Sequence, residues 1–306
     1  MSRRSIIVSA AAVVVTAAFA ALWLSQPGEP AGPCTIAVPL TVLPEMDESS
    51  GLAVSRRHRG VLWSHNDSGN ADVLFALDTS GRILAKVRVP VRTRDWEDVS
   101  AAPCPAGDCL YIADIGDNRA TRPRIMIYRV PEPALSDAET AAPEVFPATY
   151  ADGPHNAEGM FVVGTDAFIV TRDRQAGVYR TSLSSTRGGD LVFKRIGELG
   201  LAAVTDAEAS VDGDAVVVRT SHEAVFYRSD DLAGGRATPY FRIGLDRFRE
   251  PQGEAIAVDG NMLYLSSEHR RLTSGGWFMS LRCQLPSTAR EGKPPGPPSR
   301  PPSGAD

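Results

Sequence analysis

The chain has 306 residues, which is enough for one large all-β domain or two smaller ones. It carries 32 Lys and Arg against 37 Asp and Glu, so its formal net charge is −5. A protein that grips nucleic acid through its phosphates needs a basic face, so this charge balance argues against a nucleic-acid partner.

The N-terminal residues 1–25 are expected to form a signal peptide or a membrane anchor. Arg3 and Arg4 precede an uncharged, apolar run over residues 5–24, and about 20 apolar residues can span a bilayer as a helix. Ala18-Phe19-Ala20 resembles a signal-peptidase site, whereas the length of the run favours an uncleaved anchor; both alternatives stay open. In either case the rest of the chain is expected outside the cytoplasm, either secreted or anchored to the cell membrane.

The remainder of the chain divides by composition. Residues 26–33 are expected to be a Pro- and Gly-rich linker, and residues 286–306 a disordered Pro-rich tail. Between them, over 34–285, short alternating apolar runs are separated by Gly, Asp and Asn clusters, which is typical of an all-β fold. We expect this domain to be a monomer.

An acidic motif recurs through the domain and predicts its architecture. A glutamate stands at the head of a short apolar strand five times, at intervals of 49, 61, 50 and 46 residues: Glu48, Glu97, Glu158, Glu208 and Glu254. A four-stranded propeller blade takes about 40–50 residues. The sequence therefore predicts a single β-propeller of five four-stranded blades, with six blades left possible by the 61-residue interval.

The two ends of the domain are expected to close the ring. The fifth repeat lacks a fourth strand, and spare strand sequence, Ile36 to Leu40, lies ahead of the first repeat. A propeller closes when one terminal strand completes the other terminal blade, and this would bring Cys34 beside Cys283. Cys104 and Cys109 bracket a turn sequence, so the predicted disulfides are Cys34–Cys283 and Cys104–Cys109.

The five glutamates are expected to converge near the propeller axis, because the first strand of each blade lines the central channel. A ring of carboxylates suits Ca²⁺, which takes 6–8 oxygen ligands. The alternative is structural, with each glutamate accepting backbone N–H bonds from the next blade. Loops after the second strands should surround the ring with further polar side chains: His65, Asn66, Asp67, Asp114, Asp117, Asn118, Arg172, Asp173, Arg219, His222, Glu268 and His269.

Four of these residues are candidates for catalysis: Arg172, Arg219, His65 and His222. Arg172 and Arg219 take equivalent places in successive repeats, and arginines facing a metal-bearing acidic channel suit an anionic ligand such as a phosphate ester. Ion pairs with neighbouring carboxylates are the alternative role. The sequence contains no nucleophile elbow, zinc-protease motif, P-loop or dinucleotide fingerprint.

Glu48-Ser49-Ser50-Gly51-Leu52, followed by Leu62-Trp63, Asn66-Asp67 and Leu77-Asp78, resembles the opening of the SdiA-regulated and phytase-like β-propeller families. The resemblance implies a secreted or envelope propeller and, in the phytase-like members, calcium and phosphoester chemistry. A glutamate heading each inner strand is also similar to the calcium-activated nucleotidases (apyrases), which are five-bladed with an axial calcium. On that analogy the five glutamates would be the ligands.

The predicted function is a binding module at the cell envelope, with an acidic Ca²⁺ site on its axis and a small anionic ligand or an envelope partner. Two alternatives are enzymes: a Ca²⁺-dependent phosphoester or nucleotide hydrolase, and a metal-dependent lactonase-like hydrolase.

Overall fold

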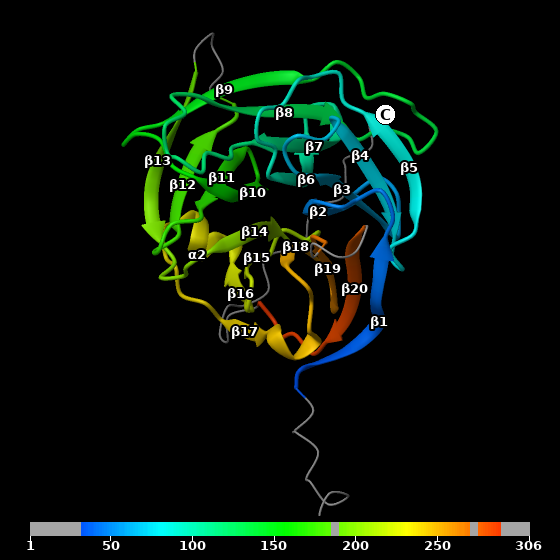
Figure 1. Ribbon diagram of the computed structural model, residues 1–306. Helices are drawn as coiled ribbons and strands as arrows, with labels where there is room; N and C mark the ends of the chain where they lie inside the picture. The colour runs from blue at the N-terminus through cyan, green and yellow to red at the C-terminus, as the bar shows by residue number, and fades with distance from the viewer. Residues whose placement is uncertain (1–31, 185–189, 270–274, 289–306) are drawn as a thin grey trace, which may run out of the picture.

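The computed structural model describes residues 32–184, 190–269 and 275–288, and their strands form five four-stranded blades around one axis (Figure 1). The predicted signal or anchor segment, most of the linker and most of the Pro-rich tail lie outside the described residues. Among the residues that are described, no helix is long and apolar enough to span a membrane.

Each blade is an antiparallel meander that starts at the axis and ends at the rim. Blade 1 contains β2 (Ser49–Val54), β3 (Val61–Asn66), β4 (Val73–Asp78) and β5 (Ile83–Arg88). Blade 2 contains β6 (Asp98–Cys104), β7 (Gly107–Asp114), β8 (Ile125–Pro131) and β9 (Glu144–Tyr150). Blade 3 contains β10 (Ala157–Val163), β11 (Asp166–Thr171), β12 (Gly177–Ser182) and β13 (Leu191–Glu198). The outer strands β9 and β13 also pair in parallel, which joins blades 2 and 3 into one eight-stranded sheet.

Blade 4 contains β14 (Val204–Ala209), β15 (Ala215–Thr220), β16 (Glu223–Arg228) and β17 (Phe241–Gly244). A short helix, α2 (Ser229–Ala233), follows β16, and a 3-10 turn, η1 (Asp246–Phe248), follows β17. Blade 5 contains β18 (Gly253–Asp259), β19 (Met262–Ser267) and β20 (Gly276–Cys283), and its fourth strand is β1 (Cys34–Leu43).

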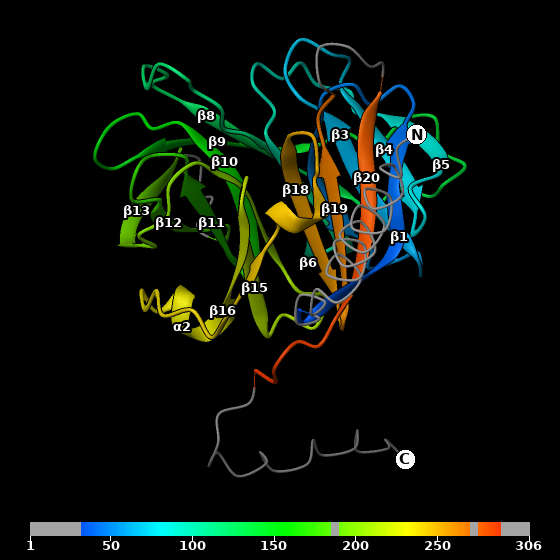
Figure 2. The ribbon, with the colours of Figure 1, turned by 60° about the horizontal axis from the view of Figure 1, so that its bottom comes forward.

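The ring closes as the sequence predicts. β1 lies beside β20 (Figure 2) and pairs with it in antiparallel orientation. Cys34 stands opposite Cys283, and the two residues form a disulfide. The second predicted disulfide, Cys104–Cys109, joins the hairpin between β6 and β7. The interval between Glu97 and Glu158, all of it described, holds only the four strands of blade 2, so there is no sixth blade. Its extra length lies in the loop over residues 132–143.

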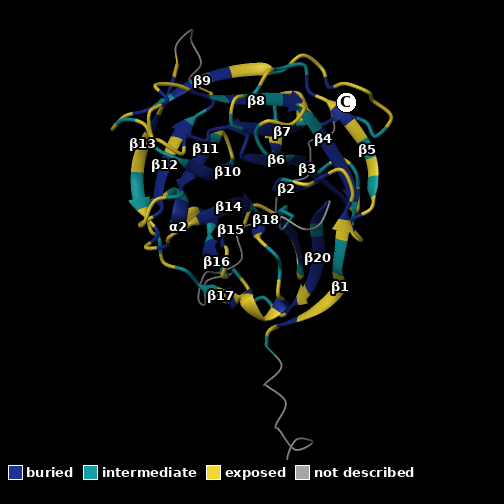
Figure 3. Ribbon diagram, viewed as in Figure 1, coloured by how far each residue is buried: buried dark blue, intermediate teal, exposed yellow. Residues whose placement is uncertain are grey.

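Burial follows the radius of the propeller (Figure 3). The inner strands are buried along almost their whole length, as in β10, whereas outermost strands such as β5 alternate between exposed and buried residues. Each of five apolar clusters lies between two neighbouring blades, for example Trp63 of blade 1 with Val99 of blade 2. The hydrophobic core is therefore a ring of interfaces between blades, and the interface between blades 5 and 1 forms only when the ring closes.

Removing the Cys34–Cys283 disulfide should lower stability far more than removing Cys104–Cys109. The two bonds close loops of very different size, with sequence separations of 249 and 5 residues. The chain-entropy model assigns them about 5 and about 2 kcal/mol respectively. Urea unfolding of the two double Cys→Ser variants measures the difference. Equal losses in the two variants would contradict a ring that depends on its closing strand.

Candidate functional site

The inner strands carry a repeated irregularity that sets the geometry at the axis. Register shifts mark a β-bulge near the start of four inner strands, and the unpaired residue is Gly51 in β2, Glu158 in β10, Thr205 in β14 and Glu254 in β18. Glu97 takes the corresponding place ahead of β6, with its N–H bonded to the Ala113 carbonyl. These five residues are therefore equivalent around the axis, and three of them are glutamates.

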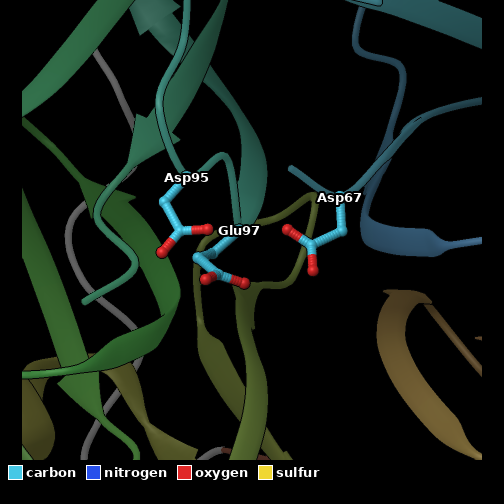
Figure 4. Close-up of side chains that lie close together, drawn as sticks. All are labelled: Asp67, Asp95 and Glu97. Carbon is cyan, nitrogen blue, oxygen red and sulfur yellow. The ribbon is translucent and has the colours of Figure 1, made fainter. Parts of the chain in front are cut away.

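Three carboxylates from two neighbouring blades lie close together near these five equivalent residues. One ligand atom each of Asp67, Asp95 and Glu97 lie within 4.8 Å of one another (Figure 4). Asp67 follows β3, whereas Asp95 and Glu97 stand in the chain that enters β6. Gly116 leaves the space that they need, because a Cβ there would overlap Glu97 Oε1 and lie 2.6 Å from Asp95 Oδ2.

Crowding and burial disfavour the charged forms of this trio. Burial raises the pKa of Glu97 well above its usual range, and the negative charges of its carboxylate neighbours raise it further. Burial also raises the pKa of Asp67 to about 6, although a backbone bond from Ser68 opposes the shift. A bound cation would remove this penalty, since it supplies the missing opposite charge.

Glu158 lies next to this trio and has the only guanidinium that contacts a ring carboxylate among the described residues. Arg172 Nη1 lies 2.9 Å from Glu158 Oε2, and Asn156 donates a weaker bond of 3.4 Å to the other oxygen. Burial nevertheless raises the pKa of Glu158, so its two partners offset only part of the desolvation. The single positive charge of Arg172 is thus fewer than the negative charges of the carboxylates around it.

Glu254 and Glu268 lie near the same carboxylates, with Glu158 a charged neighbour of both. The Gln252 amide donates to both carboxylates, 3.0 Å from Glu254. Burial raises the pKa of each glutamate to about 7, with further negative charges adding to the shift. Thr205 stands between blades 3 and 5 in the ring, and its buried hydroxyl has no hydrogen-bond partner among the described residues.

We call this set the acidic mouth. It consists of six carboxyl groups and one guanidinium: Asp67, Asp95, Glu97, Glu158, Glu254, Glu268 and Arg172.

Two of the five predicted glutamates fall outside the ring. Glu48 stands three residues ahead of Gly51 and is half-buried, and its Oε2 accepts a bond of 2.6 Å from Asn70. Glu208 lies three residues beyond Thr205 in β14 and is fully buried, so it sits deeper than the mouth. Sequence alignment matched the tripeptide around Glu208, but in blade 4 the bulge falls on a threonine.

Several polar loop residues hold the mouth in place without belonging to it. Asp114 pairs with Arg122 at 2.9 Å and accepts the N–H groups of Arg94 and Asp95, which fixes the chain that carries Asp95. The Asp117 N–H donates to Asn156 Oδ1 at 2.8 Å, and Asn118 Oδ1 accepts from the Asn156 amide at 3.4 Å.

Other predicted polar residues shape their own turns. Asn66 Oδ1 accepts the N–H of Glu48 at 3.2 Å, and Asp173 accepts the Gln175 N–H at 2.9 Å. His269 Nδ1 donates a hydrogen bond of 2.8 Å to the Asp47 carbonyl. Such bonds are what Asn and Asp commonly provide in turns.

The two candidate arginines are not equivalent in the structure. Arg219 pairs in register with Asp206, and its counterpart in blade 3 is Val170, two positions before Arg172. Arg219 is wholly buried: Nη1 donates to the Ala255 carbonyl at 2.6 Å and Nη2 to Glu250 at 2.7 Å. It therefore joins blade 4 to blade 5, which is the ion-pair alternative.

Neither candidate histidine lies in the mouth. His65 is buried and stacked on Trp96 at 4.2 Å, and burial lowers its pKa to about 3, so the ring is neutral. His222 is exposed and pairs with Asp246 at 2.8 Å. Of the four candidates, Arg172 alone contacts a carboxylate of the mouth.

Sequence reasoning missed three acidic residues. Asp95 completes the trio, and the acidic run Asp95-Trp96-Glu97-Asp98 was the available signal. Asp98 accepts the Met160 N–H and Asp206 accepts the Ile256 N–H, each at 2.6 Å. The role of accepting backbone bonds from the next blade, considered above for the glutamates, is thus filled by these two aspartates.

Comparison with known proteins finds distant structural similarities only. No family model and no curated protein matches this chain. Among solved structures it is similar to U3-55K, with 12% identity, a TM-score of 0.40 and coverage of 77% of this chain and 68% of that one. It is also similar to the β-propeller domain of Myceliophteria thermophila Cps50 (Swd1), with 12% identity, a TM-score of 0.41 and coverage of 79% and 98%.

The Dos1 propeller is similar at 9% identity and a TM-score of 0.36, over 76% of this chain and 57% of that one, so the match spans less than two thirds of its length. These similarities carry no functional argument. Of the predicted resemblance to SdiA-regulated, phytase-like and apyrase propellers, only the β-propeller fold is confirmed, by the closed ring of blades described above, and function has to be argued from the site.

Without a cation the free energy of unfolding should fall as pH rises from about 5 to 8. Glu254 and Glu268 have pKa values near 7 when folded, above those of the unfolded chain, so the folded state binds more protons over this range. Each such carboxyl contributes a slope of up to ~1.4 kcal/mol per pH unit. Urea unfolding in EDTA measures this slope, and a free energy that stayed level or rose would contradict the burial argument.

Proposed function

We propose that the acidic mouth binds Ca²⁺ and that the propeller is a calcium-dependent binding module outside the cytoplasm. One observation carries the proposal: ligand atoms of Asp67, Asp95 and Glu97 gather within 4.8 Å at the axis. All three donors are hard carboxylate oxygens, which favours Ca²⁺ over metals that prefer nitrogen or sulfur ligands.

The position of the trio suggests what the ion would do. Asp67 belongs to blade 1, and Asp95 and Glu97 lead into blade 2, so an ion held by all three would tie two loops of one face together. Ca²⁺ takes 6–8 oxygens, and three side chains leave coordination positions open. A carboxylate or phosphate of a ligand would fill those positions, with Arg172 nearby as a second anion contact. This supports a small anionic ligand or an envelope partner.

The cysteines support a location outside the cytoplasm. All four are paired in disulfides, and such bonds persist in oxidising compartments. The apolar run over residues 5–24 would direct export or hold the chain at the membrane. We therefore propose a protein that is secreted or anchored at the cell surface.

Calcium should raise the melting temperature of the wild type, and Glu97→Gln should abolish most of the rise. A ligand that binds only the folded state stabilises it, by about 2.7 kcal/mol at a hundredfold excess over Kd. Glutamine keeps the shape of Glu97 but removes its charge. Thermal melting in EDTA and in Ca²⁺ measures the effect.

Two further variants sharpen this experiment. Glu198→Gln makes the same chemical change at an exposed glutamate at the end of β13, and it should keep the full response to calcium. Gly116→Ala leaves every charge in place but intrudes on Glu97 and Asp95, so it should weaken the response. Equal calcium responses in the wild type and Glu97→Gln would exclude the mouth as the site.

A phosphoester hydrolase is the second candidate, favoured by Arg172 standing 2.9 Å from Glu158 beside the proposed ion. There the metal would polarise a phosphoryl oxygen and Arg172 would hold the anion. The lactonase-like alternative lacks such support, because His65 and His222 lie outside the mouth.

If the hydrolase candidate is correct, the wild type should cleave phosphoesters or nucleotides in Ca²⁺ but not in EDTA. Arg172→Gln should then raise KM for the anionic substrate roughly tenfold or more, because a charged hydrogen bond to it is lost. A substrate panel assayed for released phosphate checks this. Calcium stabilisation without turnover would leave the binding module as the function.

A further inference from the structure

A second group of carboxyls lies on the axis below the acidic mouth. Asp98 of β6 belongs to blade 2, whereas Asp206 and Glu208 of β14 belong to blade 4, so the side chains approach from blades that are not neighbours. Asp98 and Asp206 are close enough to hydrogen-bond to each other, and Glu208 Oε1 accepts the Ala101 N–H of β6 at 3.4 Å. Gly159 of the intervening blade 3 has no side chain to separate them.

Part of this group has an evident structural role. Asp98 takes N–H bonds on both oxygens, from Val99 and Met160, each at 2.6 Å. Asp206 Oδ2 takes the Ile256 N–H at 2.6 Å. These bonds link the inner strands of successive blades and fix the orientation of both carboxyls.

Three other oxygen atoms of this group are not used in these links between blades. Asp206 Oδ1, Glu208 Oε2 and Ser100 Oγ make no hydrogen bond of normal geometry with a described residue, although Asp206 lies close to Asp98 and Ser100 close to Glu208, and all three side chains are buried to at least 98%. Unsatisfied buried oxygens cost free energy, so such groups normally meet a partner in proteins. Ser100 lies beside Glu208, close enough for its hydroxyl to favour the charged carboxylate. The three oxygens thus come from the same small region of the channel.

We propose that Ser100, Asp206 and Glu208 form an inner site for a second hard divalent cation, of the Ca²⁺ type, below the acidic mouth. Two carboxylates and a hydroxyl are hard oxygen ligands of the kind that Ca²⁺ binds. Water or shared protons would satisfy the hydrogen bonds only with the carboxyls neutral, whereas a divalent cation would let both of them ionise. The inner site shares no residue with the acidic mouth, so the two proposed cation sites can be tested separately.

A purely structural role does not require a carboxylate at position 208. The link between blades is made by Asp98 and Asp206, whereas Glu208 contributes one long bond to β6 and leaves its second oxygen unpaired. Burial raises the pKa of Glu208 well above its usual range, so without a cation this residue is a neutral acid. Glutamine would serve that purpose equally well, which makes Glu208→Gln a mild substitution.

Counting bound Tb³⁺, a luminescent substitute for Ca²⁺, tests the proposal on the intact domain. The wild type should bind one ion more per chain than Glu208→Gln, and one more than Glu97→Gln. Luminescence decay in H₂O and D₂O reports how many waters each ion keeps. The ion retained by Glu97→Gln should hold fewer waters than the ion retained by Glu208→Gln, because the inner site is enclosed. Glu198→Gln, exposed at the end of β13, should bind as the wild type does.

Ser100→Ala covers the case in which Glu208→Gln fails to fold. It leaves all charges unchanged and should weaken the inner ion about tenfold, with no effect on the mouth. If Glu97→Gln removes all binding while Glu208→Gln and Ser100→Ala remove none, the inner carboxyls hold only protons and water, and the proposal is overturned. If instead the wild type binds only an ion that Glu208→Gln removes, the inner site stands and the proposed role of the mouth is wrong.

Discussion

Closing five blades into a ring forces the inner strands to face one another across a narrow axis, and the acidic side chains that they carry are buried as a result. Cys34 and Cys283 stand 249 residues apart in the chain, yet their pairing completes the last blade. Every apolar cluster lies between two blades, and the two clusters that include β1 residues, Cys34 and Leu43, are complete only when the circle is closed. The raised pKa of Glu97, Glu254 and the deeper carboxyls follows from this geometry, since water is excluded where these groups converge.

The sequence contained most of the architecture, because blades are local units and their rhythm is repeated. Short apolar runs with turn residues between them predict the meanders, and the missing fourth strand of the last repeat predicts the closure by β1. The level of each side chain on the axis was harder to predict. The inner strands are buried on both faces, so their apolar pattern does not mark where a bulge falls, and the match of Glu208 to Glu158 was plausible in sequence. In blade 4 the bulge falls on Thr205 instead.

The roles of polar loop residues were also hard to predict from the sequence. Asp67 follows the second strand of blade 1 and Asp114 ends the second strand of blade 2, and composition alone does not separate them. In the structure Asp67 faces the acidic mouth, whereas Asp114 is enclosed by Arg122 and two backbone N–H groups. The difference depends on partners from other segments, notably Asp95, whose position beside Asp67 arises only when blades 1 and 2 pack together. A ligand set drawn from two blades is therefore a tertiary property.

The two arginines indicate how a repeated scaffold becomes asymmetric. Arg219 lies in the interface between blades 4 and 5, where Nη1 donates to the Ala255 carbonyl and Nη2 to Glu250. Arg172 lies farther along its blade and reaches only Glu158 at the mouth. The mouth consequently has an all-acidic side over blades 1 and 2 and a mixed side at blade 3. A cation on the first side and an anionic group reaching from it toward Arg172 would match this polarity, whereas a uniform acidic ring would bind the cation alone.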